Sequence, residues 1–148
     1  MDTWLVANGD LVLAGGTFAT LSGPAKIQQD LGIASLTPYG SDRFHPKWGS
    51  VLGQYIGSPV GPMTQALLQS EINRLISNYQ KVQLNRMNTV ITQGYATVYG
   101  LNDLVGSVQS ITVTQNYDSF SINATVVTMA GTTVSINSSV AASGPSAG

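Results

Sequence analysis

Few residues of this chain have the chemistry of a catalytic group. His45 is the single histidine and follows Asp42 by three positions, so an imidazole–carboxylate pair is conceivable. Glu71 is the single glutamate, and a two-carboxylate hydrolase would have to pair it with one of six scattered aspartates. Neither Ser22 nor Ser50 lies in a nucleophile-elbow pattern. We therefore predict that the chain has no catalytic residues and is not an enzyme.

Metal and cofactor sites are not predicted either. With no cysteine and one histidine, the chain lacks the usual ligands of a transition-metal site. Gly15-Gly16 lacks the spacing of a phosphate-binding loop and precedes a predicted strand, so we interpret it as a hairpin turn.

Composition excludes two further classes of partner. The net charge is −1 and only 9% of residues are charged, well below the roughly 25% of soluble domains. Without a basic patch we expect no nucleic-acid partner. No run of about 18 apolar residues is present, and the N-terminus has no positive region typical of a secretory signal, so we expect no membrane partner.

A long helix beginning at Pro62 is the main predicted element. Apolar residues recur at steps of three or four along it, which predicts one apolar stripe: Leu68, Ile72, Leu75, Ile76, Tyr79 and Val82. We expect the first five of these to be buried under the C-terminal sheet. The helix is expected to continue to about Val98 and to stop at Gly100. An end near Asn88, followed by a strand through the β-branched residues 89–92, is the alternative.

Shorter elements precede this helix. We predict a hairpin from Asp10–Ala14 and Thr17–Leu21, and then a helix from Pro24 that ends at Gly32 and buries Ile27, Leu31 and Ile33. The loop 36–49 follows, in which Phe44 and Trp48 should anchor against a short helix at Ser50–Ile56.

A three-stranded antiparallel sheet is predicted after Gly100. Two strands, Ser107–Gln115 and Asp118–Met129, alternate apolar and polar residues, and a third runs from Thr132 to Ile136. The predicted fold is therefore α+β: an N-terminal β-hairpin and short helices, one long central helix, and a C-terminal antiparallel three-stranded sheet. We expect a single domain over residues 1–138 and a disordered tail over 139–148.

The last 30 residues, after Asp118, contain no charged side chain. One interpretation is a Ser/Thr-rich sheet face followed by a flexible tail. The other is that these strands are covered by another protein, since a strand edge without charge is not protected from pairing.

The order of several motifs resembles the small baseplate wedge proteins of contractile phage tails, the sheath initiators, which are also present in type VI secretion baseplates. The resemblance extends from Asp10 to about Ile136, and these residues carry it: Asp10, Gly23, Ile27-Gln28, Leu31, Leu36-Thr37, Gly40, Phe44-x-Pro46-x-Trp48-Gly49-Ser50, Leu52 and Gly57 before the long helix, with three strands after it.

The resemblance implies a structural protein of the virion, made in the host cytoplasm and present in several copies around the tail. Its implied partners are the tail sheath protein and other baseplate wedge and hub or tube proteins. The family's sheet is similar to the sheath part through which neighbouring sheath subunits exchange strands, so the sheath would start on it by strand pairing. The outward polar residues of the first two strands are then candidate contacts: Thr112, Thr114, Ser121 and Asn123.

One motif departs from the family. Members usually carry Glu-Pro-Arg before the first strand of the sheet, where this chain has Asn102-Asp103-Leu104. If the family's Glu and Arg contact a partner, this chain must make that contact differently, or Arg86 is a displaced substitute; Asn102, Asp103 and Arg86 are therefore candidate partner contacts. Trp48 is a further candidate if it is exposed.

Two other functions remain as alternatives. Some members of the family were once labelled lysozymes, so one is a cell-wall hydrolase that uses Glu71 or the Asp42 and His45 pair. The other is a different structural tail component of the tube or neck.

Overall fold

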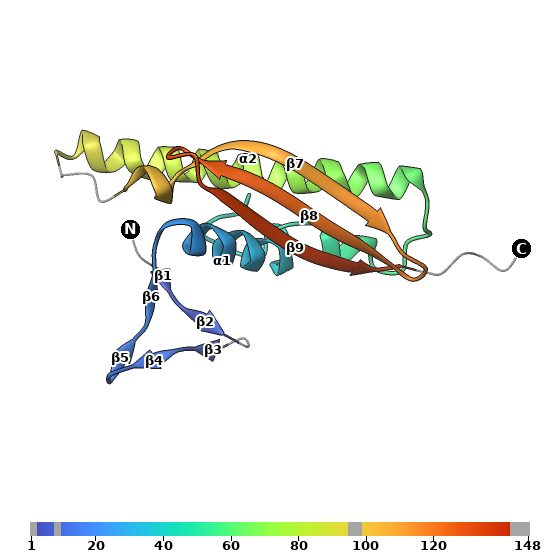
Figure 1. The fold of residues 1–148 in the computed structure, drawn as a ribbon, viewed down its shortest axis with the longest axis horizontal. Coiled ribbons are helices and arrows are strands. Elements are labelled where there is room, and N and C mark those ends of the chain that lie inside the picture. The colour runs from blue at the N-terminus through green and yellow to red at the C-terminus, as the bar shows by residue number, and fades with distance from the viewer. Residues whose placement is uncertain (1–2, 8–9, 95–98, 143–148) are drawn as a thin grey trace, which may run out of the picture.

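The computed structural model describes residues 3–7, 10–94 and 99–142. It is an α+β fold in which a long helix and a three-stranded antiparallel sheet lie side by side (Figure 1). The small N-terminal strands are β1 (Thr3–Trp4), β2 (Val6–Ala7), β3 (Asp10–Leu11), β4 (Leu13–Ala14), β5 (Thr17–Phe18) and β6 (Thr20–Leu21). The remaining elements are α1 (Gly23–Leu36), the 3₁₀ helix η1 (Leu52–Tyr55), α2 (Pro62–Thr92), η2 (Leu101–Asp103), β7 (Val105–Gln115), β8 (Ser119–Thr128) and β9 (Thr133–Ala141).

The N-terminal strands form three short ladders and not the one hairpin that the sequence predicts. The turn at Gly15-Gly16 is confirmed: both glycines have positive φ, 58° and 84°, and β4 pairs with β5 across them. The outer halves of the expected hairpin pair elsewhere, β3 with β2 and β6 with β1. Backbone bonds that link Leu5, Val12 and Ala19 in a ring join the three ladders into the triangular unit seen in Figure 1.

α1 begins where proline predicts, since Pro24 occupies its first turn, but it ends later than expected. Gly32 lies inside the helix, which continues to Leu36. Ile27 and Leu31 are buried as predicted, whereas Ile33 is 43% exposed. The extra turn therefore places Ile33 on the side of α1 that faces away from the core.

α2 begins at Pro62 as predicted and ends at Thr92, not at about Val98. Gly94 follows with φ of 76°, a left-handed conformation that stops a helix, and residues 95–98 lie outside the described residues. The alternative strand through residues 89–92 is also wrong, because Thr89 and Thr92 donate their hydroxyls to helix carbonyls four residues earlier, at Asn85 and Asn88.

The core forms where α1 and α2 pack against one face of the sheet. The five stripe residues of α2 that we expect to be buried are at most 4% exposed: Leu68, Ile72, Leu75, Ile76 and Tyr79. Val82, the last residue of the stripe, is half-buried. They meet the inward residues of the strands, among them Val113, Phe120, Ile122 and Ala124. Helical period three-to-four and strand period two thus both predicted the buried sides correctly.

The third strand is longer than expected. β9 runs to Ala141, and Val140 is only 4% exposed within the core. The expected boundary at 138/139 therefore falls inside a strand, and the predicted disorder is wrong for residues 139–141. Residues 143–148 lie outside the described residues.

The loop between α1 and α2 differs from expectation in its anchors. Phe44 is 89% exposed, so its predicted anchoring role is wrong. Trp48 is half-buried, and its ring lies 6.0 Å from that of Tyr79 on α2. Only Leu52–Tyr55 of the predicted Ser50–Ile56 helix is helical, as the 3₁₀ turn η1.

Candidate functional site

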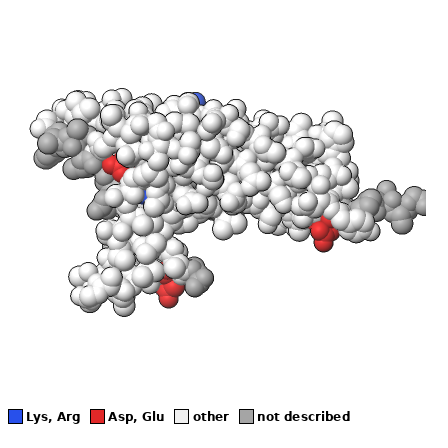
Figure 2. All heavy atoms as spheres, in the orientation of Figure 1, with Lys and Arg blue, Asp and Glu red and all other residues white. Residues whose placement is uncertain are grey.

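The outward face of the sheet is a grid of uncharged polar side chains. Register places three residues across each row, one from each strand, because Thr112 pairs with Asn123 and Asn123 with Asn137. The adjacent rows have the same character, and the nine residues of this polar face are Ser110, Thr112, Thr114, Ser121, Asn123, Thr125, Ser135, Asn137 and Ser139. Figure 2 shows coloured, charged atoms only around the margins of the region that these strands occupy.

The four sheet residues chosen from the sequence belong to this face. Thr112, Thr114 and Asn123 are exposed and Ser121 is half-buried. Neutral hydroxyls and amides lose less solvation free energy than ions when another protein covers them. The face is therefore suited to being covered, and five further members complete it beyond the predicted four.

The backbone of Thr112 and Thr114 does not face the outer edge of the sheet. The amide of Asn116 donates to the carbonyl of Ser119 at 2.8 Å, and the register from there puts alternate residues of β7, including Thr114 and Thr112, in hydrogen-bonded pairs with β8. A partner strand therefore could not use these two amides, and only their side chains are available.

The outward carbonyls of β7 accept hydrogen bonds from glutamines of α2. Gln65 donates to Val113 at 2.6 Å, and Gln69 donates to Ile111 at 3.2 Å. Further along, Gln80 donates to Val105 at 3.1 Å and to Gly106 at 3.0 Å. We call Gln65, Gln69 and Gln80 the glutamine caps.

Sequence reasoning missed the glutamine caps. The available signal was the recurrence of glutamine at four- and eleven-residue steps on one flank of the apolar stripe, which places the amides beside a single neighbouring strand. Amide side chains at such positions can substitute for the backbone of a missing strand, because each carries the donor that an unpaired carbonyl needs.

Asn102 and Asp103, two of the predicted partner contacts, also make hydrogen bonds within the chain. The side-chain oxygen of Asn102 accepts from the hydroxyls of Thr128 at 3.1 Å and Thr132 at 2.8 Å. Asp103 accepts from the backbone amides of Gly23 at 2.6 Å and Gly100 at 2.8 Å. Burial raises the pKa of Asp103, whereas interactions that include these two amide bonds lower it, and the pKa lies below its usual value.

The other sequence candidates lie together in a cleft of about 310 Å³ between α1, α2 and the loop. Trp48, Arg86, His45 and Asp42 all line it, and Arg86 is exposed. The Nδ1 of His45 lies 2.8 Å from Asp42, and this hydrogen bond is the main reason that the pKa of Asp42 is lowered. The His45 side chain is exposed and that of Asp42 is half-buried.

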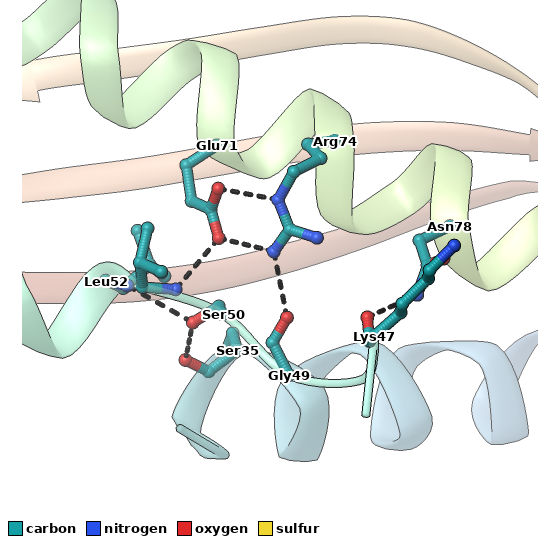
Figure 3. Close-up of polar contacts among 9 residues, drawn as sticks. Ser35, Lys47, Gly49, Ser50, Leu52, Glu71, Arg74 and Asn78 are labelled. Carbon is teal, nitrogen blue, oxygen red and sulfur yellow. Dashed lines mark hydrogen bonds and ion pairs between the residues drawn. The ribbon is translucent and has the colours of Figure 1, made fainter. Parts of the chain in front are cut away.

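Glu71 fastens the loop to α2 (Figure 3). Both of its oxygens accept from the Arg74 guanidinium, at 2.8 and 2.7 Å, and one also accepts from the amide of Val51 at 2.9 Å. Arg74 in turn donates to the carbonyl of Gly49 at 2.9 Å. We call Glu71 and Arg74, with their bonds to Val51 and Gly49, the clamp. Glu71 precedes Arg74 by three positions, so the sequence alone indicates a weakly stabilising helical ion pair. It does not show the contacts of either side chain with the loop backbone.

The environment of Glu71 keeps its carboxylate ionised. Burial raises the pKa of Glu71, but the hydrogen bonds from Arg74 and from the Val51 amide outweigh burial, and the pKa lies below its usual value. Gly49, which the clamp holds, has φ of 95°, and a Cβ there would lie 2.6 Å from the carbonyl oxygen of Thr37. The loop therefore requires glycine at this position for two reasons.

Within the part of the chain that the structure describes, no three histidine, aspartate or glutamate side chains gather as a metal site would require. No helix among the same residues is both long and apolar enough to cross a bilayer. Comparison with protein-family models, with curated proteins and with solved structures found no match for the chain.

Proposed function

We propose that this chain is a structural protein of a contractile phage tail baseplate, and that the tail sheath begins to assemble on its sheet by strand pairing. The observation that carries the proposal is the polar face, an uncharged grid across three strands. A surface of this kind fits a partner that covers it and pairs with its edge, because little ionic solvation is lost on docking.

The setting of the protein follows from the same proposal. It is a virion component made in the host cytoplasm, present in multiple copies around the tail, and its partners are the sheath protein, other baseplate wedge proteins and hub or tube proteins. Nucleic acid and membrane are not among them. The motif order from Asp10 to Ile136 supports this assignment, and Asn102 and Asp103 stand where the family carries Glu-Pro-Arg.

The geometry of Glu71 favours this structural role over a cell-wall hydrolase. A carboxylic general acid must still hold its proton near neutral pH, which needs a raised pKa, whereas an ion pair and an amide lower the pKa of Glu71. The simple test is clearing of purified peptidoglycan, where we expect no activity. Clearing that is lost in Glu71→Gln would contradict the structural assignment.

Assembly itself tests the proposal. Baseplates that lack this protein are supplied with a variant and with sheath subunits, and the tails are imaged. Ser121→Lys combined with Asn123→Lys adds two charges to the polar face and should prevent sheath formation. The matched control is Asn85→Lys with Asn88→Lys on exposed positions of α2, which adds the same charge away from the sheet. Normal sheaths with the face variant would show that the sheath does not start on this surface.

A further inference from the structure

Alternate residues of β9 present their backbone to the outer edge of the sheet. The register with β8 is unbroken, and the amide of Ala142 donates to the carbonyl of Asp118 at 2.7 Å. Even-numbered residues of β9 therefore bond to β8, and odd-numbered residues from Thr133 to Ala141 face outward. The side chains of Asn137 and Ser139, on the polar face, are exposed as well.

The edge of β9 is closed at two points and open between them. Gln28 of α1 donates to the carbonyl of Ser135 at 2.9 Å, and the amide of Gly57 donates to that of Ala141 at 2.9 Å. Among the described residues, none hydrogen-bonds to the outward amides and carbonyls of Asn137 and Ser139. We call Asn137–Ser139 the β9 window.

A groove of about 420 Å³ runs beside the β9 window, with the C-terminal half of α1 as its other wall. Gly32 leaves space in that wall, and two apolar side chains stand at it: Ile33 is 43% and Leu36 is 81% exposed. None of the residues that line the groove is charged.

We propose that the β9 window takes up one extended, uncharged segment of a partner chain, which adds as a fourth strand and places an apolar side chain against Ile33 and Leu36. This rests on the proposed function and adds which edge the partner uses. The glutamine caps close the other edge, since the carbonyls of Ile111 and Val113 already have donors. The polar neighbours of the groove lose little solvation free energy to an uncharged segment.

A second copy of this chain fits the groove less well than a single segment does. Edge-to-edge pairing of two β9 strands would bring a second α1 alongside the first, because α1 packs along β9 in each copy. The α1 helices of both copies would then have to fit beside the same pair of β9 strands. An isolated extended segment, without a helix of its own at that side, avoids this conflict.

Binding of a designed probe tests the window directly. The probe is a fluorescent, acetylated and amidated heptapeptide that alternates threonine with valine and has leucine at its centre. Its affinity is measured from the rise in the fluorescence anisotropy of the peptide as the full chain is added. Asn137→Pro removes one outward donor without touching the β8 ladder and should weaken binding about tenfold or more. Asn137→Ala, the matched control, keeps the amide and should bind as the wild type does.

Two further measurements keep the result interpretable. If Asn137→Pro does not fold, Leu36→Asp leaves the backbone intact, and it should also weaken binding by placing a charge beside the apolar side chain. Amide hydrogen exchange should slow at Asn137 and Ser139 when the probe is bound. The proposal would be overturned if the wild type did not bind the probe, or if Asn137→Pro and Leu36→Asp bound it as tightly as the wild type. Protection from exchange at Ile111 and Val113 in place of Asn137 and Ser139 would also overturn it.

Failure of the proposed function has a different signature. Tails that form normal sheaths with the charged polar face would refute the assembly role, whatever the peptide does. Binding of the peptide at Ile111 and Val113, together with sheath loss in the polar-face variant, would leave the assembly role intact and refute only the choice of edge.

Discussion

β7 and β9 are the two outer strands of one sheet, yet their outward carbonyls meet different neighbours. Along β7, glutamine amides of α2 reach Val105, Gly106, Ile111 and Val113. Along β9, bonds from Gln28 and Gly57 leave the β9 window between them. An exposed strand edge invites pairing with other chains, and side-chain donors are one way to satisfy it without adding a strand.

This difference explains how a sheet with almost no charge can allow strand pairing at one edge and resist it at the other. Natural edges are often protected by lysine or proline, but no lysine occurs after Lys81 in this chain. The glutamine caps provide protection on one side by hydrogen bonding alone. A partner strand at β7 would have to displace them, whereas at the β9 window it meets unpaired backbone.

The largest expected effect comes from loosening α2, which holds the glutamine caps in register. Ile72 is 4% exposed against the sheet, and Ile72→Ala should lower the free energy of unfolding by about 2–5 kcal/mol. Met63→Ala, at a position 79% exposed on the same helix, should change it little. Urea denaturation measures both, and an unchanged midpoint for Ile72→Ala would mean that the stripe does not pack as described.

Glu71→Gln should cost about 1.5–3 kcal/mol near neutral pH, since it replaces charge-assisted bonds to Arg74 with weaker ones. The folded pKa is lowered, so this contribution is present above the ordinary value of 4.5 and is lost as pH falls through the folded pKa. The difference between wild type and variant should therefore shrink on acidification. A gap that stays constant from pH 7 down to strongly acidic pH would contradict the ionised clamp.

Proline substitutions compare the two directions in which strand amides point. Thr112→Pro should lower stability by about 1–3 kcal/mol, because it leaves a carbonyl of β8 without its donor. Asn137→Pro should cost much less, since its amide faces the β9 window. Thermal or urea unfolding of both variants decides this, and equal losses would show that the assigned backbone directions are wrong.

The smallest effects belong to the glutamine caps taken singly. Gln69→Ala should lower stability by only about 0.5–1.5 kcal/mol, since one hydrogen bond is lost at an exposed site. Removing all three caps should open the β7 edge and increase self-association, which light scattering would detect. Replacing Gln93, just beyond α2, serves as the control, and a triple variant that stays monomeric would remove the protective role from the caps.

Periodicity made the central part of this fold predictable. The apolar stripe of α2 and the alternation in β8 each repeat over several turns or pleats, so single exceptions do not change the outcome. Helix ends were less predictable: the sequence predicts a stop at Gly32, although α1 runs through it, and a stop at Gly100, although α2 ends at Thr92 just before Gly94. A glycine stops a helix only where the chain adopts positive φ there, and the sequence does not show that.

The features that define the candidate site depend on contacts distant in the chain. Gln65 and Val113 are 48 positions apart, and the clamp at Glu71 reaches 20 positions back to Val51. Local patterns carry no information about such pairs. The end of β9 was missed for a different reason: its serines suggested disorder, although Val140 continues the alternation of Val134 and Ile136.

The position of this chain in an assembled tail tests the assembly role most directly. A small tag on a loop outside the sheet, such as the segment at the exposed Phe44, can be labelled with gold and imaged by electron microscopy. We predict label at the baseplate end of the tail, in several copies, where the first sheath ring begins. Label along the tube, at the neck, or absent from tails would contradict the account.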